Sequence, residues 1–375
     1  MTQLSIEAGL ALLCLLVWPV FRWGFRHLPG EGWQIAWVIP ARRPEGDGRR
    51  WPAVNITFYG VISAVAYTVA ALAYVFLMGA HGQPLGAAAV YAALLLALGV
   101  PASKWMTKLI EGQRGHTIGG AVFVAIVAAL PALALTQEIL AALGLPPLDG
   151  AVTVACAAAC YVLGESIGRL ACLSFGCCYG KPIAQCTPLQ RALYGPTATV
   201  YRGRMKKIAY ESNLAEEPVV AVQSIACVLL FALFVIAVWL LWRGWVAASL
   251  IVAVSGSQLW RAYSETLRAD FRGREGFTAY QGMAVVAALL APLYAWWLQV
   301  EPGFRPVADA RAGWTAVFRI EVLLTCQALG LAMLYLMGRS YVTSARLDFE
   351  LHLSSSASQT LPAGQRALAS EASSR

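Results

Sequence analysis

The sequence predicts an all-α integral membrane protein, and two observations carry this prediction. The chain has 375 residues, of which 59% are hydrophobic and only 13% are charged, and its mean hydropathy is +0.62. A soluble domain of this length does not have such a composition. About nine apolar runs are long enough to cross a bilayer as helices. We therefore exclude a soluble fold.

The predicted spans follow one another with short connections. In chain order they are 4–21, 54–78, 87–103, 117–137, 151–175, 218–242, 245–262, 277–300 and 314–338. The first of them could be taken for a signal peptide, but Glu7 precedes its apolar core, and neither a basic segment nor a small-residue cleavage site flanks it. We interpret it as a retained span.

Charge is distributed unevenly between the two sides of the predicted membrane domain. Of the 28 Lys and Arg residues, 22 lie in alternate connections and the tail, at 22–53, 103–116, 176–217, 263–276 and 339–375. The other connections hold only Arg243, Arg305 and Arg311. The positive-inside rule then places the C-terminus and the loop 176–217 in the cytoplasm. The net charge of +8 is explained by topology and anionic lipid, so we expect no nucleic-acid partner.

Charged residues within the spans predict a binding site. The fifth span carries Glu165 and Arg169, and the seventh ends in Arg261, Glu265 and Arg268, which would share one face if the helix continued. Two arginines from separate helices, braced by a glutamate, can grip a phosphate because guanidinium offers planar bidentate donors. We expect an anionic phospholipid as the partner; the alternative is a salt-bridge lattice that fixes helix ends.

Thiols lie beside this cluster. Cys172, Cys177 and Cys178 follow Arg169, and a neighbouring cation increases the thiolate fraction of a cysteine. A zinc site is the alternative, but the spacing lacks the usual Cys-x2-Cys pair, so we expect no metal and no cofactor. His116, before the fourth span, is a candidate general acid or base, with a structural role as its alternative. The other cysteines are interpreted as packing residues.

Several short motifs, taken in order, resemble the prolipoprotein diacylglyceryl transferase family over about residues 54 to 300, seven of the nine spans. They are Ile56-Thr-Phe-Tyr59-Gly60, Gly168-Arg169 with Gly176 and Tyr179-Gly180, the Arg-x3-Glu-x2-Arg element at Arg261, Glu265 and Arg268, and Gln281 in the following helix. Cys172, Phe175 and Cys177 stand where the family has two asparagines and an acidic residue.

The resemblance implies transfer of a diacylglyceryl group from phosphatidylglycerol to a cysteine thiol, such as that of a lipoprotein precursor, with release of glycerol phosphate. Arg169 and Arg261, supported by Arg268, would hold the departing phosphate. The resemblance adds Glu265 to this site, with Tyr59, Gly60, Gly168, Gly180 and Gln281 in support. His116, Cys177 and Cys178 are candidate catalytic residues on their own chemistry and not through the resemblance. The family works at the outer face of the bacterial inner membrane, whereas charge places the matching loops inside.

The resemblance also divides the chain. Residues 1–53 form an extra N-terminal span and a basic loop, 54–300 form the transferase-like core with its polar loop 176–217, and 301–338 form an extra C-terminal span. The tail 339–375 is basic and is predicted to be disordered. Two other functions stay open: a cytoplasmic-facing lipid transferase that uses Cys177 or Cys178 as nucleophile, and a non-catalytic phospholipid-binding or transport protein.

Overall fold

The computed structural model describes residues 3–40, 53–112, 117–270, 276–298 and 308–338, and the predicted disorder of the tail 339–375 lies outside them. Eight helices in this part of the chain are long and apolar enough to cross a membrane. They are α1 (Gln3–His27), α2 (Phe58–Ala80), α3 (Leu85–Glu111), α4 (Ile118–Ala142), α5 (Gly150–Phe175), α8 (Val222–Trp242), α10 (Ala279–Trp297) and α12 (Ile320–Met337). The prediction of a multi-pass helical membrane protein is confirmed.

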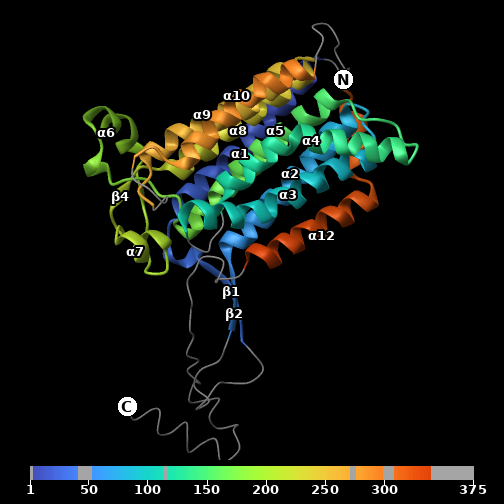
Figure 1. The fold of residues 1–375 in the computed structure, drawn as a ribbon. Coiled ribbons are helices and arrows are strands. Elements are labelled where there is room, and N and C mark those ends of the chain that lie inside the picture. The colour runs from blue at the N-terminus through green and yellow to red at the C-terminus, as the bar shows by residue number, and fades with distance from the viewer. Residues whose placement is uncertain (1–2, 41–52, 113–116, 271–275, 299–307, 339–375) are drawn as a thin grey trace, which may run out of the picture.

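The expected seventh span is a helix but is not one of these eight. Helix α9 (Val246–Ser264) runs antiparallel to α8 and α10 and packs against both (Figure 1). Its second half carries Ser255, Ser257, Gln258 and Arg261, which lower its hydropathy. The predicted segment is therefore a helix, and Ser255, Gln258 and Arg261 direct their polar groups to neighbouring helices.

Helix α5 is the central helix of the bundle. It packs against α2, α8 and α9, and it is more buried than the other seven candidate spans. Small residues permit this, since Ala155 and Ala159 are fully buried, and a Cβ at Gly164 would lie 3.1 Å from the Cβ of Ala70 on α2. Charged residues on α5 are consequently removed from lipid and water.

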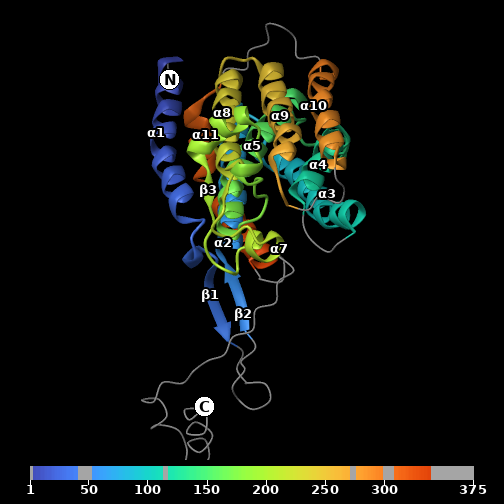
Figure 2. The same ribbon diagram turned by 90° about the vertical axis from the view of Figure 1, so that its left-hand side faces the viewer.

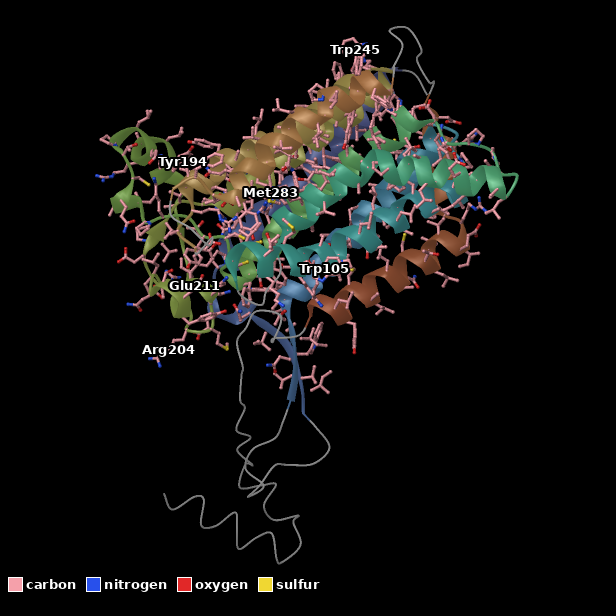
Figure 3. The ribbon with its side chains drawn as sticks, viewed as in Figure 1. Trp105, Tyr194, Arg204, Glu211, Trp245 and Met283 are labelled. Atoms are coloured by element: carbon pink, nitrogen blue, oxygen red, sulfur yellow. The ribbon has the colours of Figure 1, made fainter. Side chains whose placement is uncertain are left out.

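The outer helices present apolar side chains to the surroundings, as lipid-facing helices do. Leu15 and Leu16 on α1 and Leu331 on α12 are more than 60% exposed. Trp105 and Trp245 are exposed at opposite ends of the bundle (Figure 3). Tryptophan is enriched at both membrane–water interfaces, so these two residues are suitably placed to mark the two boundaries.

The connections at one end of the bundle form small structures of their own. Strands β1 (Ile35–Pro40) and β2 (Ala53–Thr57) form an antiparallel hairpin that projects from the bundle, and the polar loop contains α6 (Pro188–Tyr194), β3 (Thr199–Val200) and α7 (Lys207–Ser212), with β4 (Pro218–Val219) following it (Figures 1 and 2). We call the end of the bundle that carries this hairpin and the polar loop 176–217 the basic end. The hairpin was not predicted, and it moves the start of the second span from residue 54 to Phe58.

Both predicted extra spans pack on the rest of the bundle. Helix α1 contacts α8 and α5, while α12 and the short helix α11 (Ala310–Val317) contact α2. At the basic end, Gly338 after α12 accepts a 2.8 Å hydrogen bond from the backbone N–H of Thr57. At the opposite end, Asp309 N–H donates to the carbonyl of Ala80.

Candidate functional site

Arg169 and Arg261 converge on one carboxylate. Arg169 lies one turn after Glu165 on α5, while Arg261 comes from the last turn of α9, and the Nη2 atoms of both arginines donate to Glu165 Oε1. The three side chains are at most 10% exposed. The predicted convergence of two arginines from separate helices is therefore present in the structure.

Two further polar side chains complete this cluster. Tyr161 donates to Glu165 Oε2 at 2.5 Å, and Gln258 Nε2 donates to the Tyr161 hydroxyl at 2.8 Å. We call these five residues, Tyr161, Glu165, Arg169, Gln258 and Arg261, the arginine network. The α5 members recur every four residues and the α9 members are three apart, so each helix contributes one face.

A glycine on a third helix leaves space for the network. A Cβ at Gly119, near the start of α4, would lie 3.1 Å from Arg261 Nη1. This close approach gives Gly119 a packing role beside the guanidinium. The start of α4 therefore lies against the guanidinium of Arg261.

The arginine network has unused hydrogen-bond donors and a net positive charge. The Nε atoms of Arg169 and Arg261 are buried, and neither makes a hydrogen bond within the described part of the chain. Buried polar atoms without partners are rare. Two guanidiniums share one carboxylate, so an additional anion would both neutralise the excess charge and satisfy these donors.

Glu265 and Arg268 form a separate cluster. Helix α9 ends at Ser264, residues Glu265–Leu267 form a 3-10 turn, and Arg268 has an extended backbone. Arg268 pairs with Glu265 at 3.1 Å and with Asp270 at 2.5 Å. The prediction that Arg261, Glu265 and Arg268 share one helical face is wrong because the helix does not continue, and Glu165 is the glutamate that bridges Arg169 and Arg261.

The chain turns sharply after α5 and brings three thiols together. Gly176 adopts a left-handed conformation (φ 73°), and the N–H groups of Gly176 and Cys177 donate to the carbonyl of Cys172. Glycine is the usual residue at such a helix end. The sulfur atoms of Cys172, Cys177 and Cys178 lie within 4.8 Å of one another. We call this group the cysteine turn.

Two features hold the cysteine turn in place. Gln223, at the start of α8, donates from Nε2 to the carbonyl of Cys177 at 2.8 Å. Cys178 itself has a left-handed backbone (φ 57°), which is strained for a residue with a side chain. Such strain is found mainly where the surrounding structure requires a particular side-chain position.

The cysteine turn lies in a positively charged environment. Hydrogen bonds from Cys172 and Cys177, together with the charges of Arg268 and Arg169, hold the pKa of Cys178 well below its ordinary value. The pKa of Cys177 is raised well above its ordinary value, because its hydrogen bonds to the other two thiols and its burial favour the protonated form. Of these two thiols, Cys178 is therefore the one whose surroundings favour ionisation.

The remaining predicted residues have identifiable neighbours. The ring of Tyr59 packs against Phe175, with centroids 5.8 Å apart, next to the cysteine turn. Gly180 forms a backbone bridge with Arg268, and a Cβ there would lie 2.3 Å from the carbonyl oxygen of Val220. Gln281 caps the start of α10 by hydrogen bonding with Thr278, and its Nε2 also donates to the carbonyl of Ala262. His116 lies outside the described residues.

The two glycines Gly60 and Gly168 provide a matched test of packing. A Cβ at Gly60 would lie 2.2 Å from the Cα of Gly338, whereas a Cβ at Gly168 would meet nothing within 4 Å. We expect Gly60→Ala to lower the free energy of unfolding by about 1–3 kcal/mol through overpacking. Gly168→Ala should raise it by up to about 1 kcal/mol, since alanine is the better helix former. Thermal melting of both variants in detergent measures this; equal melting temperatures would contradict the close contact between α2 and the end of α12.

Sequence reasoning missed Tyr161, Gln258 and Lys206. The spacing of four that joins Tyr161, Glu165 and Arg169 was visible in the sequence and would have predicted the α5 face of the network. Lys206 gave no such signal. It is buried, and its Nζ donates to the carbonyls of Leu28 at 3.0 Å and Ser174 at 2.5 Å, so that it joins the ends of α1 and α5 to the polar loop.

Lys206 should make stability depend on pH. Burial lowers the pKa of its ammonium from 10.5 to about 7. Between these values the unfolded chain binds more protons than the folded chain, so the free energy of unfolding rises as pH increases from about 7 to about 10.5. Lys206→Met should remove this rise, whereas Lys207→Met, at the half-exposed neighbour that pairs with Glu211, should retain it. Melting temperatures at a series of pH values check this, and a slope unchanged in Lys206→Met would exclude the assignment.

The fold and this site define a polytopic helical membrane protein with a buried arginine network next to a turn of three thiols. Comparisons of the chain with models of protein families, with curated proteins and with solved structures find no match. The resemblance to the diacylglyceryl transferase family therefore rests on the motifs themselves.

Proposed function

We propose that the protein is a membrane-embedded transferase that moves a diacylglyceryl group from a phosphatidylglycerol-like lipid to a cysteine thiol. The observation that carries the proposal is the convergence of Arg169 and Arg261, from two helices, with buried and unused Nε donors. Buried charges within a membrane domain are costly and usually mark a functional site. We place the protein in a bacterial inner membrane as a multi-pass protein and count α9 as its ninth span.

The arginine network suits the departing phosphate. In the reaction, the thiolate sulfur forms a bond to the terminal glyceryl carbon, and the bond between that carbon and the phosphate oxygen breaks. The electron pair of the broken bond stays on the phosphate, which leaves as glycerol phosphate. Guanidiniums that are already in place stabilise the negative charge that develops on the leaving oxygen. Arg169 and Arg261 fill this role, and Glu165 holds both in position.

The other proposed residues have supporting roles. Arg268, held by Glu265 and Asp270, supports the phosphate site electrostatically from the basic end. The charges of both Arg268 and Arg169 act on Cys178. His116 stays a candidate for removing the thiol proton. The acceptor is a thiol-containing protein such as a lipoprotein precursor, and the reaction needs no redox cofactor because no atom is oxidised or reduced.

A radiolabelled lipid assay tests the proposal directly. Purified protein is incubated with phosphatidylglycerol labelled in its acyl chains and with a peptide that carries a lipobox cysteine. Transfer of label to the peptide, with release of glycerol phosphate, is the expected result. A peptide with serine in place of that cysteine is the matched control. If no label moves under conditions in which a family enzyme is active, the substrate assignment is wrong.

A second candidate function is favoured by the fixed position of Cys178 in the cysteine turn, where the charges of Arg268 and Arg169 act on its thiol. In it, the Cys178 thiolate attacks the terminal glyceryl carbon, glycerol phosphate leaves, and Cys178 carries the diacylglyceryl group as a thioether. A nucleophilic acceptor then attacks the same carbon and releases Cys178 as a thiolate. Mass spectrometry of protein incubated with lipid alone should then show an adduct that Cys178→Ser lacks and Cys186→Ser retains. A protein that binds phosphatidylglycerol without either product would instead be the non-catalytic lipid-binding or transport protein.

A further inference from the structure

The cysteine turn has the composition of a metal site. Three sulfur atoms within 4.8 Å of one another are close enough to share one ion. Thiolate sulfur selects soft or borderline metals such as zinc and copper(I) over magnesium or calcium. In the part of the chain that the structure describes, no fourth His, Cys, Asp or Glu joins these three. A structural zinc site has four protein ligands, whereas a catalytic zinc site has three and an open position.

The local conformation supports a shared ligand. The left-handed backbone of Cys178 and the hydrogen bond from Gln223 to Cys177 fix the turn so that both thiols point toward Cys172. A turn that served only to end α5 would not require a strained residue after Gly176, since glycine alone provides the helix end. The strained backbone of Cys178 is explained if its sulfur must lie close to those of Cys172 and Cys177 to share a ligand.

The positive charges around the cysteine turn favour a zinc ion bound by several thiolates. Zn²⁺ with three thiolates carries one negative charge, and a fourth thiolate from outside would increase this to two. Arg169 and Arg268 both act electrostatically on Cys178 and favour a negatively charged site there, in addition to their pairing with Glu165 and Glu265. A zinc ion with neutral or fewer thiolate ligands would instead be repelled by the same arginines.

We propose that Cys172, Cys177 and Cys178 bind Zn²⁺, and that its open fourth position takes the acceptor thiol as a thiolate. The role of the ion in transfer rests on the proposed function. Metal coordination deprotonates a bound thiol, and the released proton passes to water. The sulfur then attacks the glyceryl carbon of the lipid whose phosphate is held by Arg169 and Arg261. Zinc is neither oxidised nor reduced.

Metal analysis of the purified, chelator-free protein tests the site without any activity. We expect about one Zn²⁺ per chain, and a loss of zinc affinity of about 10- to 100-fold or more in Cys172→Ser, Cys177→Ser and Cys178→Ser. Cys186→Ser, in the same polar loop, and Cys227→Ser, in α8, should keep the metal. Zinc content at background in the wild type after incubation with zinc, full zinc in Cys178→Ser, or copper(I) in place of zinc would overturn the proposal.

If the cysteine variants fail to fold, a measurement on the wild-type protein still tests the site. Bound zinc should protect these three cysteines from alkylation, and a chelator should abolish the protection while Cys186 reacts equally in both states. In protein loaded with Co²⁺, addition of the lipobox peptide should change the thiolate-to-metal absorption, and the serine peptide should not. If zinc binds but no lipid is transferred, the site stands and the proposed function falls. If metal-free protein transfers lipid at the full rate, the catalytic role of zinc falls and the proposed function stands.

Discussion

Replacing Arg169 by alanine is expected to reduce transfer of the diacylglyceryl group by about 100- to 1,000-fold, the usual effect of removing one preorganised donor from a developing charge. Arg169 contributes one of two guanidiniums, and Arg261 alone cannot provide the same neutralisation. Arg169→Lys should recover only part of the activity, because an ammonium is a point charge without the planar pair of donors. The assay is the same transfer of labelled lipid to a lipobox peptide.

Arg319→Gln provides the control for this experiment. Arg319 pairs with Glu321 at the start of α12, and both side chains are more than half exposed. This change removes an arginine of the same chain without touching the arginine network, so it should leave transfer unaltered. Transfer by Arg169→Ala at the rate of the unchanged protein would exclude the phosphate site, whatever else the protein binds.

Replacing Glu165 by glutamine is expected to lower the free energy of unfolding by about 3–5 kcal/mol, as is usual when one partner of a buried ion pair is removed. Both Arg169 and Arg261 donate to this carboxylate, so a single change leaves two buried guanidiniums without a compensating charge. Thermal melting in detergent or nanodiscs measures the loss. Glu321→Gln, which breaks the exposed pair with Arg319, should leave the melting temperature almost unchanged.

The lipid used in this second experiment makes it more informative. If the network binds phosphate, nanodiscs of phosphatidylglycerol should restore part of the stability lost in Glu165→Gln, since the lipid phosphate supplies the missing negative charge. Nanodiscs of a zwitterionic lipid should restore less. Equal melting temperatures for Glu165→Gln and Glu321→Gln would show that Glu165 is not the hub of a desolvated network.

The spans were predictable because hydropathy is a local property of the chain. The start of α2 was not predicted correctly. Val54 and Ile56 in strand β2 are apolar, and in sequence they cannot be distinguished from the first residues of an apolar helix. Their conformation depends on pairing with β1, where Ile39 lies opposite Val54. Only the contact between β1 and β2 distinguishes a strand from a helix here, and the periodicity of five residues cannot reveal that contact.

The site was predictable to a similar extent. The cost of placing arginine in an apolar helix identified Arg169 and Arg261. The expectation that Glu265 shares a helical face with Arg261 depended on α9 continuing past Ser264, and helix ends are the least certain part of a sequence-based prediction. The approach of Cys172 to Cys177 and Cys178 depends on the backbone at Gly176 and Cys178, which composition does not specify.

The hydrogen bond between Gly338 and Thr57 provides a way to determine membrane orientation. Thr57 directly precedes α2, whose first turn holds Tyr59 against Phe175, so the last described residue after α12 lies on the same side of the bilayer as the three thiols. A reporter enzyme fused to the C-terminus, and active in only one compartment, would therefore report the compartment that the thiols face. Its activity would decide between the cytoplasmic side indicated by the basic loops and the outer side implied by the resemblance, without any change to the arginines or cysteines.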